Sequence, residues 1–185
     1  MRWNQNKALV AASMGIGLIS GTLRPIFLSD YSRTDLAESL YHFTTTLEAQ
    51  SIGIGELFGS ALRYGRSLLL IWACVALPKT HYAALLVLYM RAMSLSFSAV
   101  MMIVAFGGRG FAYAFALYGL QNIIIMPVYA YTAYFILKSR AALAVKPPEN
   151  LAPTVKTAAI GLAAVAAVSA VENYISPTLF ALIWR

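Results

Sequence analysis

Five ionic side chains lie inside or at the edges of long apolar segments, where a membrane-spanning helix would bury them. They are Glu56, Arg63, Arg66, Arg91 and Glu172. A charge at membrane depth costs free energy, so it usually belongs to a transport pathway, a buried ion pair or a binding site. These residues are therefore the first candidates for function.

The spacing of these charges leaves two interpretations open. Arg63 and Arg66 are three residues apart and share a helix face, and Glu56 precedes Arg63 by seven residues. Arg91 falls near the middle of an apolar run, where insertion scales assign roughly 2.5–3.5 kcal/mol to arginine. In a structural interpretation, Arg63 and Arg66 extend to the membrane surface, and Arg91 pairs with Glu56 or Glu172. In the other interpretation, the charges line a polar pathway.

Two amide side chains, Gln121 and Asn122, precede Pro127 in another apolar run. Proline removes a helical hydrogen bond, so we expect a kink or break at Pro127. Amides at this depth can hydrogen-bond across helices or to carbonyl groups that the proline leaves without a donor. We expect them to act mainly as structural links.

Small residues recur at the spacing that lets two helices approach closely. Gly17 and Gly21 form one such pair, and Gly55 and Gly59 form another. A later apolar run is rich in alanine around Gly161 and leaves little bulky surface for lipid. We expect that run to pack against protein on more than one side, which is compatible with a homo-oligomer.

Common signatures of catalysis are missing from the sequence. It has no phosphate-binding loop, no zinc-protease helix motif and no nucleophile elbow. Cys74 is the only cysteine, which excludes an internal disulfide and a cysteine zinc site. His42 and His81 fall in different expected loops. We expect neither an enzyme nor a bound cofactor or metal.

The composition indicates lipid as the solvent. Of the 185 residues, 60% are apolar and 11% are charged, against roughly 45–50% and about 25% in soluble domains. The net charge of +7 is scattered between apolar runs, whereas nucleic-acid binding needs clustered cations. We therefore interpret the charge as a determinant of membrane topology and expect no nucleic-acid partner.

Runs of about 20 apolar residues can span a bilayer, and the sequence predicts one all-α membrane domain, residues 1–185, with about five crossings. The expected crossings are 8–28, 57–77, 82–106, 111–137 and 154–171. Segment 32–51 is an amphipathic helix that lies on the membrane surface or, more simply, packs on a neighbour. Its Ser32 and Asp35 resemble a capping box. Residues 174–185 suggest a short interfacial or re-entrant helix.

Positive residues near helix ends predict the orientation, because they favour the cytoplasmic side. With the N-terminus inside, the cytoplasmic cations are Arg2, Lys7, Lys79, Lys138, Arg140, Lys146 and Lys156. Segment 29–52 is then outside and is net acidic. We expect a multi-pass protein of a bacterial cytoplasmic membrane with its N-terminus in the cytoplasm.

Several of these features resemble a known family. Residues 56–58 read Glu-Leu-Phe and open a leucine-rich run that ends near Pro78. Residues 120–122 read Leu-Gln-Asn and are followed by Pro127, and residues 172–177 fit the pattern E-x-Y-x-x-P. In this order, from about residue 56 onward, the chain resembles the stage II sporulation protein M membrane proteins.

The resemblance implies a helical bundle similar to the membrane part of ABC-2 type exporters. It also implies a non-enzymatic scaffold in endospore formation, which recruits two peptidoglycan-degrading partners, stage II sporulation proteins D and P, to the septal membrane during engulfment. The alternative from the residues themselves is a transport component, either a permease with a separate ATPase or a lipid-handling protein. An intramembrane enzyme is a third hypothesis.

Overall fold

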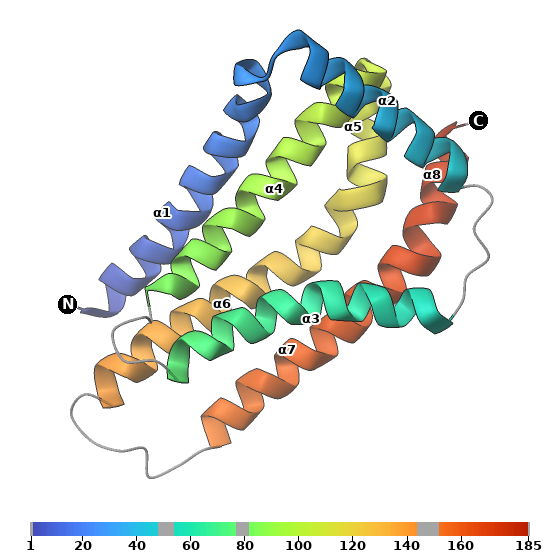
Figure 1. The fold of residues 1–185 in the computed structure, drawn as a ribbon. Helices are drawn as coiled ribbons and strands as arrows, with labels where there is room; N and C mark the ends of the chain where they lie inside the picture. Colours follow the sequence, from blue (N-terminus) through green and yellow to red (C-terminus); the bar gives the residue numbers. More distant parts are fainter. Residues whose placement is uncertain (1, 48–53, 77–81, 144–151, 185) are drawn as a thin grey trace.

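The computed structural model describes residues 2–47, 54–76, 82–143 and 152–184, and the chain in these ranges is helical except at Leu28, Ser29, Tyr82 and Gly107 (Figure 1). The expected all-α bundle is therefore confirmed. Its α-helices are α1 (Arg2–Leu23), α2 (Asp30–Leu47), α3 (Ile54–Ala76), α4 (Ala83–Phe106), α5 (Gly108–Ala114), α6 (Leu120–Leu143), α7 (Ala152–Ala170) and α8 (Ser176–Trp184). A 3-10 turn, η1 (Arg24–Phe27), precedes α2, and two π-helical segments, η2 (Phe115–Gly119) and η3 (Val171–Ile175), join α5 to α6 and α7 to α8.

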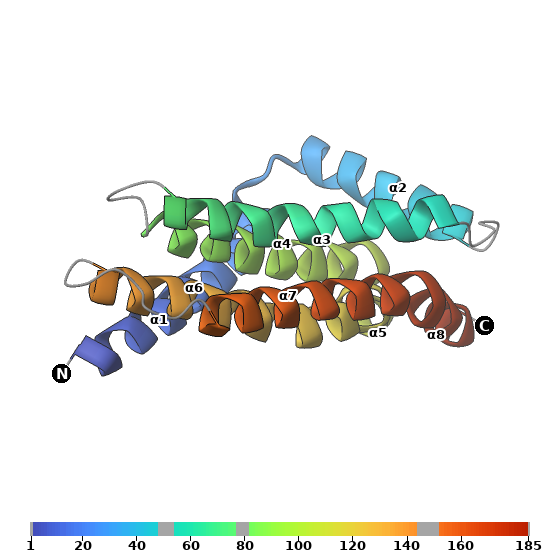
Figure 2. The same ribbon diagram turned by 90° about the horizontal axis from the view of Figure 1, so that it is seen from below.

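Successive long helices run in alternating directions along the bundle. α3, α4, α6 and α7 lie side by side in both views, with α1 against α4 (Figures 1 and 2). The first helix begins at one end of the bundle, and the last helix ends at the opposite end (Figure 1). α2 crosses the end of the bundle at which α5 and α8 lie (Figure 1).

Within the described residues, four helices are long and apolar enough to cross a membrane, and the chain is a multi-pass membrane protein on this basis. They are Gln5–Phe27, Ala83–Phe106, Gly108–Ser139 and Ala152–Ile183. The expected second crossing, 57–77, corresponds to α3, which is not among these four. Glu56, Arg63 and Arg66 make α3 more polar, although it runs along the bundle beside α6 and α7 (Figure 2).

The end of the chain differs from the prediction. We expected Glu172 and Asn173 to close the last crossing and a separate interfacial helix to follow. Instead, α7, η3 and α8 form one continuous helical stretch. Pro177 lacks an amide hydrogen, and just before it the Ser176 amide donates to the Val171 carbonyl, five residues earlier. The helix continues through this wider turn, and its axis changes direction at η3 (Figure 1).

A second difference concerns Pro127. α6 continues through this proline without interruption. The irregular turn lies earlier, at η2, where the Leu120 amide donates to the Phe115 carbonyl. Of the predicted kink or break at Pro127, the break is therefore wrong, and the fourth expected crossing is a longer helical stretch with a π-helical turn.

α2 packs on the bundle, as the simpler of the two interpretations predicted. Leu40 and Phe106 both pack against a small core cluster that includes Phe180, and the rings of Tyr41 and Phe106 stack with centroids 6.2 Å apart. The helix begins earlier than expected, at Asp30. Ser29 Oγ accepts the Ser32 amide at 3.2 Å, so Ser29 rather than Ser32 satisfies the first turn. Residues 48–51 of the expected segment lie outside the described residues.

One of the two predicted glycine pairs lies at a contact between helices, and the other does not. A Cβ on Gly17 would lie 2.5 Å from the Tyr89 carbonyl oxygen, and one on Gly21 would meet the Met93 carbonyl, so this pair permits the contact of α1 with α4. Gly161 likewise faces Leu68 of α3. In contrast, a Cβ on Gly55 or Gly59 would meet nothing within 4 Å. The second pair therefore packs on nothing in the part of the chain that the structure describes.

Candidate functional site

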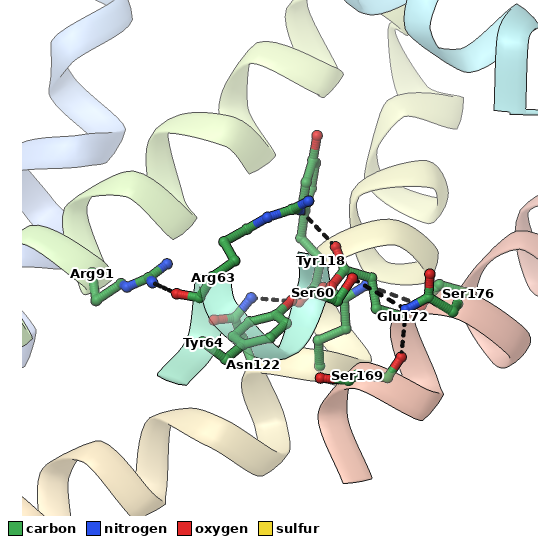
Figure 3. A network of polar contacts seen from close by, with 11 residues as sticks. Ser60, Arg63, Tyr64, Arg91, Tyr118, Asn122, Ser169, Glu172 and Ser176 are labelled. Carbon is green, nitrogen blue, oxygen red and sulfur yellow. Dashed lines mark hydrogen bonds and ion pairs between the residues drawn. The ribbon is translucent and has the colours of Figure 1, made fainter. Parts of the chain in front are cut away.

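Polar side chains gather around the two π-helical segments, where hydrogen bonds link α3, α6 and α8 (Figure 3). π-helical turns inside longer helices are rare and occur frequently at functional sites. Here η2 lies against α8, and η3 lies against α3. The contact thus brings together three parts of the chain that are far apart in the sequence.

Gln121 links three helices at the centre of this polar network. Its Oε1 accepts the Tyr64 hydroxyl of α3 at 2.7 Å, and its Nε2 donates to Ser176 Oγ of α8 at 3.1 Å. All three side chains are buried. The predicted role of Gln121 as a link across helices is confirmed.

Arg63 and Glu172 form an ion pair between α3 and η3 (Figure 3). Arg63 Nη1 lies 2.8 Å from Glu172 Oε1, and the arginine side chain is 63% exposed whereas the glutamate side chain is 19% exposed. Glu172 Oε2 is buried and accepts no hydrogen bond from the described residues. The ion pair is therefore exposed on its Arg63 side, whereas the second carboxylate oxygen of Glu172 is buried.

Arg91 of α4 is held by neutral oxygen atoms rather than by a carboxylate. Its Nε donates to Ser67 Oγ at 2.6 Å, and its Nη2 donates to the Arg63 carbonyl at 2.7 Å (Figure 3). Its guanidinium carbon also lies 5.9 Å from the centroid of the Tyr129 ring, a cation–π distance. The expected pairing of Arg91 with Glu56 or Glu172 is therefore wrong, because Glu172 pairs with Arg63 and Arg91 meets α3 one turn further along.

Three other predicted residues lie outside these cross-links. Asn122 Nδ2 donates to the Tyr118 carbonyl of its own helical stretch at 2.7 Å and makes no link to another helix. Glu56 and Arg66 are exposed on α3, and no hydrogen bond or ion pair among the described residues engages either of them. They do not join the network around Gln121.

The sequence interpretation missed several members of the network. Asn173 Nδ2 donates to Ser60 Oγ at 3.1 Å and to the Ser169 carbonyl at 2.7 Å, and the Tyr129 hydroxyl donates to the Tyr64 carbonyl at 2.8 Å. One signal was available in the sequence. Ser60, Tyr64 and Ser67 are spaced by four and three residues, so they form a polar stripe on one face of α3.

This arrangement cross-links helices, because the buried side chains of Tyr64, Gln121 and Ser176, from three helices, bond to one another. Within the described ranges, no three His, Cys, Asp or Glu side chains gather as a metal site would require. Comparisons of the chain with family models, with curated proteins and with solved structures find no match.

Proposed function

We propose that the protein is a non-enzymatic membrane scaffold that holds peptidoglycan-remodelling proteins at the septal membrane, as its resemblance to stage II sporulation protein M implies. The observation that supports this proposal is that polar side chains inside the bundle are hydrogen-bonded to neighbouring helices. Arg91 and Gln121 each make two hydrogen bonds to neighbouring helices. Such groups fix the arrangement of helices.

A transport pathway would need a different arrangement. Polar residues on such a path face water or exchange partners with the substrate. Here the hydroxyl and amide of Tyr64 and Gln121 are buried and bonded to each other. This favours a rigid bundle whose function lies on its outer surfaces.

The end of the bundle at α2 offers a surface for partners. Asp35 and Glu38 are exposed on α2. We propose that the N-terminus is cytoplasmic, because cations near helix ends favour that side. α2 then lies on the outer side of a bacterial cytoplasmic membrane, where wall-remodelling proteins act. The acidic surface of α2 would bind basic surfaces of those proteins.

The experiment is co-purification with stage II sporulation proteins D and P after co-expression and extraction in mild detergent. The double variant Asp35→Lys/Glu38→Lys reverses the charge of the α2 surface. The control is Lys156→Glu, which reverses the charge of an exposed residue on α7. We expect the α2 variant to retain about one tenth or less of the bound partner, equivalent to about 1.4 kcal/mol. Lys156→Glu should retain normal binding. Failure of the unaltered chain to retain either partner would contradict the proposal.

One observation favours the second candidate, a transport or lipid-handling component. Glu172 Oε2 is buried without a hydrogen-bond donor, and its partner Arg63 is largely exposed. A transport role requires this pair to open to water or substrate during function. Replacing Arg91 by Leu distinguishes the scaffold from the transport component. A scaffold would still bind its partner proteins, whereas a transporter would lose a charge on its transport pathway.

A further inference from the structure

Arg66 is an unpaired cation in the middle of α3. It is exposed, and no hydrogen bond or ion pair among the described residues engages it. α3 has 23 residues, which corresponds to about 34 Å at 1.5 Å per residue, so Arg66 lies roughly 15–18 Å from either end. The hydrocarbon core of a bilayer is about 30 Å thick. α3 is not itself one of the four apolar spans, but it packs along α6 and α7, which belong to two of them, and this packing would place Arg66 near the middle of the membrane.

The surface around Arg66 is not covered by this chain. Leu62 is 57% exposed and Leu69 is 68% exposed, and both lie within one turn of Arg66. Figures 1 and 2 show α3 on the outside of the bundle, with α6 and α7 on its inner side. Gly59, two turns before Arg66, also has open space around it. A guanidinium at this depth is costly in lipid and usually pairs with a carboxylate or a backbone carbonyl, so a protein neighbour with such an acceptor would stabilise this surface.

A second copy of the chain offers no free acceptor among the described residues. Rotation about the membrane normal keeps each residue at its own depth, so a twofold contact at this surface would bring two Arg66 side chains together, and any other symmetric contact would need a carboxylate at the depth of Arg66. Glu56 is ten residues away, about 15 Å along the helix axis. Glu172, the other carboxylate beside α3, already pairs with Arg63.

We infer that this surface of α3 binds a single membrane-spanning helix of another protein that carries an Asp or Glu at mid-depth. An arginine and a carboxylate that meet away from water form charge-assisted hydrogen bonds, and the small residues of α3 allow close approach. The inference rests on the proposed scaffold function and adds the chemistry of one partner. It concerns a surface separate from α2.

The test uses a defined probe, a synthetic leucine- and alanine-rich membrane helix with one central Glu. Matched probes carry Gln or Leu at the same position. Binding to the full chain is measured by energy transfer in phosphatidylcholine vesicles. Polar contacts between model membrane helices are worth about 1–2 kcal/mol, so we expect the Glu probe to bind about tenfold more tightly than the Leu probe. Arg66→Gln should abolish this preference, and Arg109→Gln, which removes an exposed cation between α4 and α6, should preserve it.

Three results would overturn the inference. The first is equal binding of the Glu and Leu probes, and the second is a Glu preference that survives Arg66→Gln. The third is loss of the preference for Glu when anionic phosphatidylglycerol is added, because the net negative headgroups would then compete with the probe as acceptors for Arg66. Any of these would leave the scaffold proposal intact if co-purification through α2 succeeds. Failure of that co-purification with a normal probe result would instead reject the proposed wall-remodelling partners.

Discussion

Gln121 of α6 donates from Nε2 to Ser176 Oγ of α8 at 3.1 Å, so one hydrogen bond joins the turns that follow the two π-helical segments. The same amide accepts the Tyr64 hydroxyl of α3. The irregular turns therefore lie where α3, α6 and α8 are linked, which suggests that the wider helical turns place these side chains in register.

Replacing Gln121 by Leu tests this link. The Tyr64 hydroxyl and Ser176 would lose their partner inside the bundle, and a buried polar group without a hydrogen bond costs about 1–3 kcal/mol. We expect a fall of this size in the free energy of unfolding, measured by detergent-induced unfolding. Asn122→Leu is the matched control, because Asn122 bonds only within its own helical stretch. An equal effect of the two substitutions would refute a special role for Gln121.

Arg91 allows a test of whether its charge or its geometry matters. Lysine keeps the charge but lacks the planar group that reaches both Ser67 Oγ and the Arg63 carbonyl. Leucine removes the charge, and Ser67 can then bond back to the carbonyl four residues earlier. We therefore expect Arg91→Lys to destabilise the bundle by about 1–3 kcal/mol and Arg91→Leu by less. The reverse order in thermal unfolding would show that the charge itself is required.

The Arg63–Glu172 pair calls for a double-mutant cycle. Glu172→Gln leaves Arg63 without its carboxylate at membrane depth, whereas Arg63→Gln/Glu172→Gln removes both charges. We expect a coupling free energy of about 0.5–3 kcal/mol between the two sites. Unfolding of the unaltered protein, of the single variants Glu172→Gln and Arg63→Gln and of the double variant in the same detergent measures this coupling. Additive effects of the single substitutions would mean that the ion pair does not stabilise the fold.

The glycine pairs give a prediction with a built-in control. Alanine at Gly21 would collide with the Met93 carbonyl and Ser96 Oγ of α4, and overpacking of this kind costs about 1–3 kcal/mol. Alanine at Gly59 meets nothing within 4 Å, and its better helix propensity is worth about 0.5–1 kcal/mol. Gly21→Ala should lower the melting temperature, and Gly59→Ala should leave it unchanged or raise it. Similar losses in both would contradict the observed packing of α1 on α4.

The sequence predicted the helices well where apolar runs end at strong helix breakers. The expected crossing 82–106 matches α4, Ala83–Phe106, within one residue, because Gly107 follows with a positive φ of 61°. It predicted the end of the last crossing poorly. Glu172 and Asn173 were interpreted as a stop, but their side chains find partners in Arg63 and Ser60, so the helix continues.

The partners of the polar residues could not be predicted, because they depend on which helices are neighbours. Nothing in the sequence around Arg91 specifies that α4 lies beside Ser67 of α3. The π-helical turns also lack a distinctive sequence pattern, so the meeting of η2 with α8 emerges only from the fold. Apolar periodicity indicates that polar residues need partners, and helix packing decides which partners they find.

Water access to Ser176 tests whether the polar network of Tyr64, Gln121 and Ser176 is closed to water and therefore structural. Cys74→Ala removes the single cysteine, and Ser176→Cys or Asp35→Cys is then added. In proteoliposomes, a charged methanethiosulfonate reagent should label the exposed α2 variant readily and leave the Ser176→Cys variant unlabelled until the protein is denatured. Labelling of the Ser176→Cys variant at a rate similar to that of the Asp35→Cys variant would show that water reaches the network, and it would indicate a water-filled pathway.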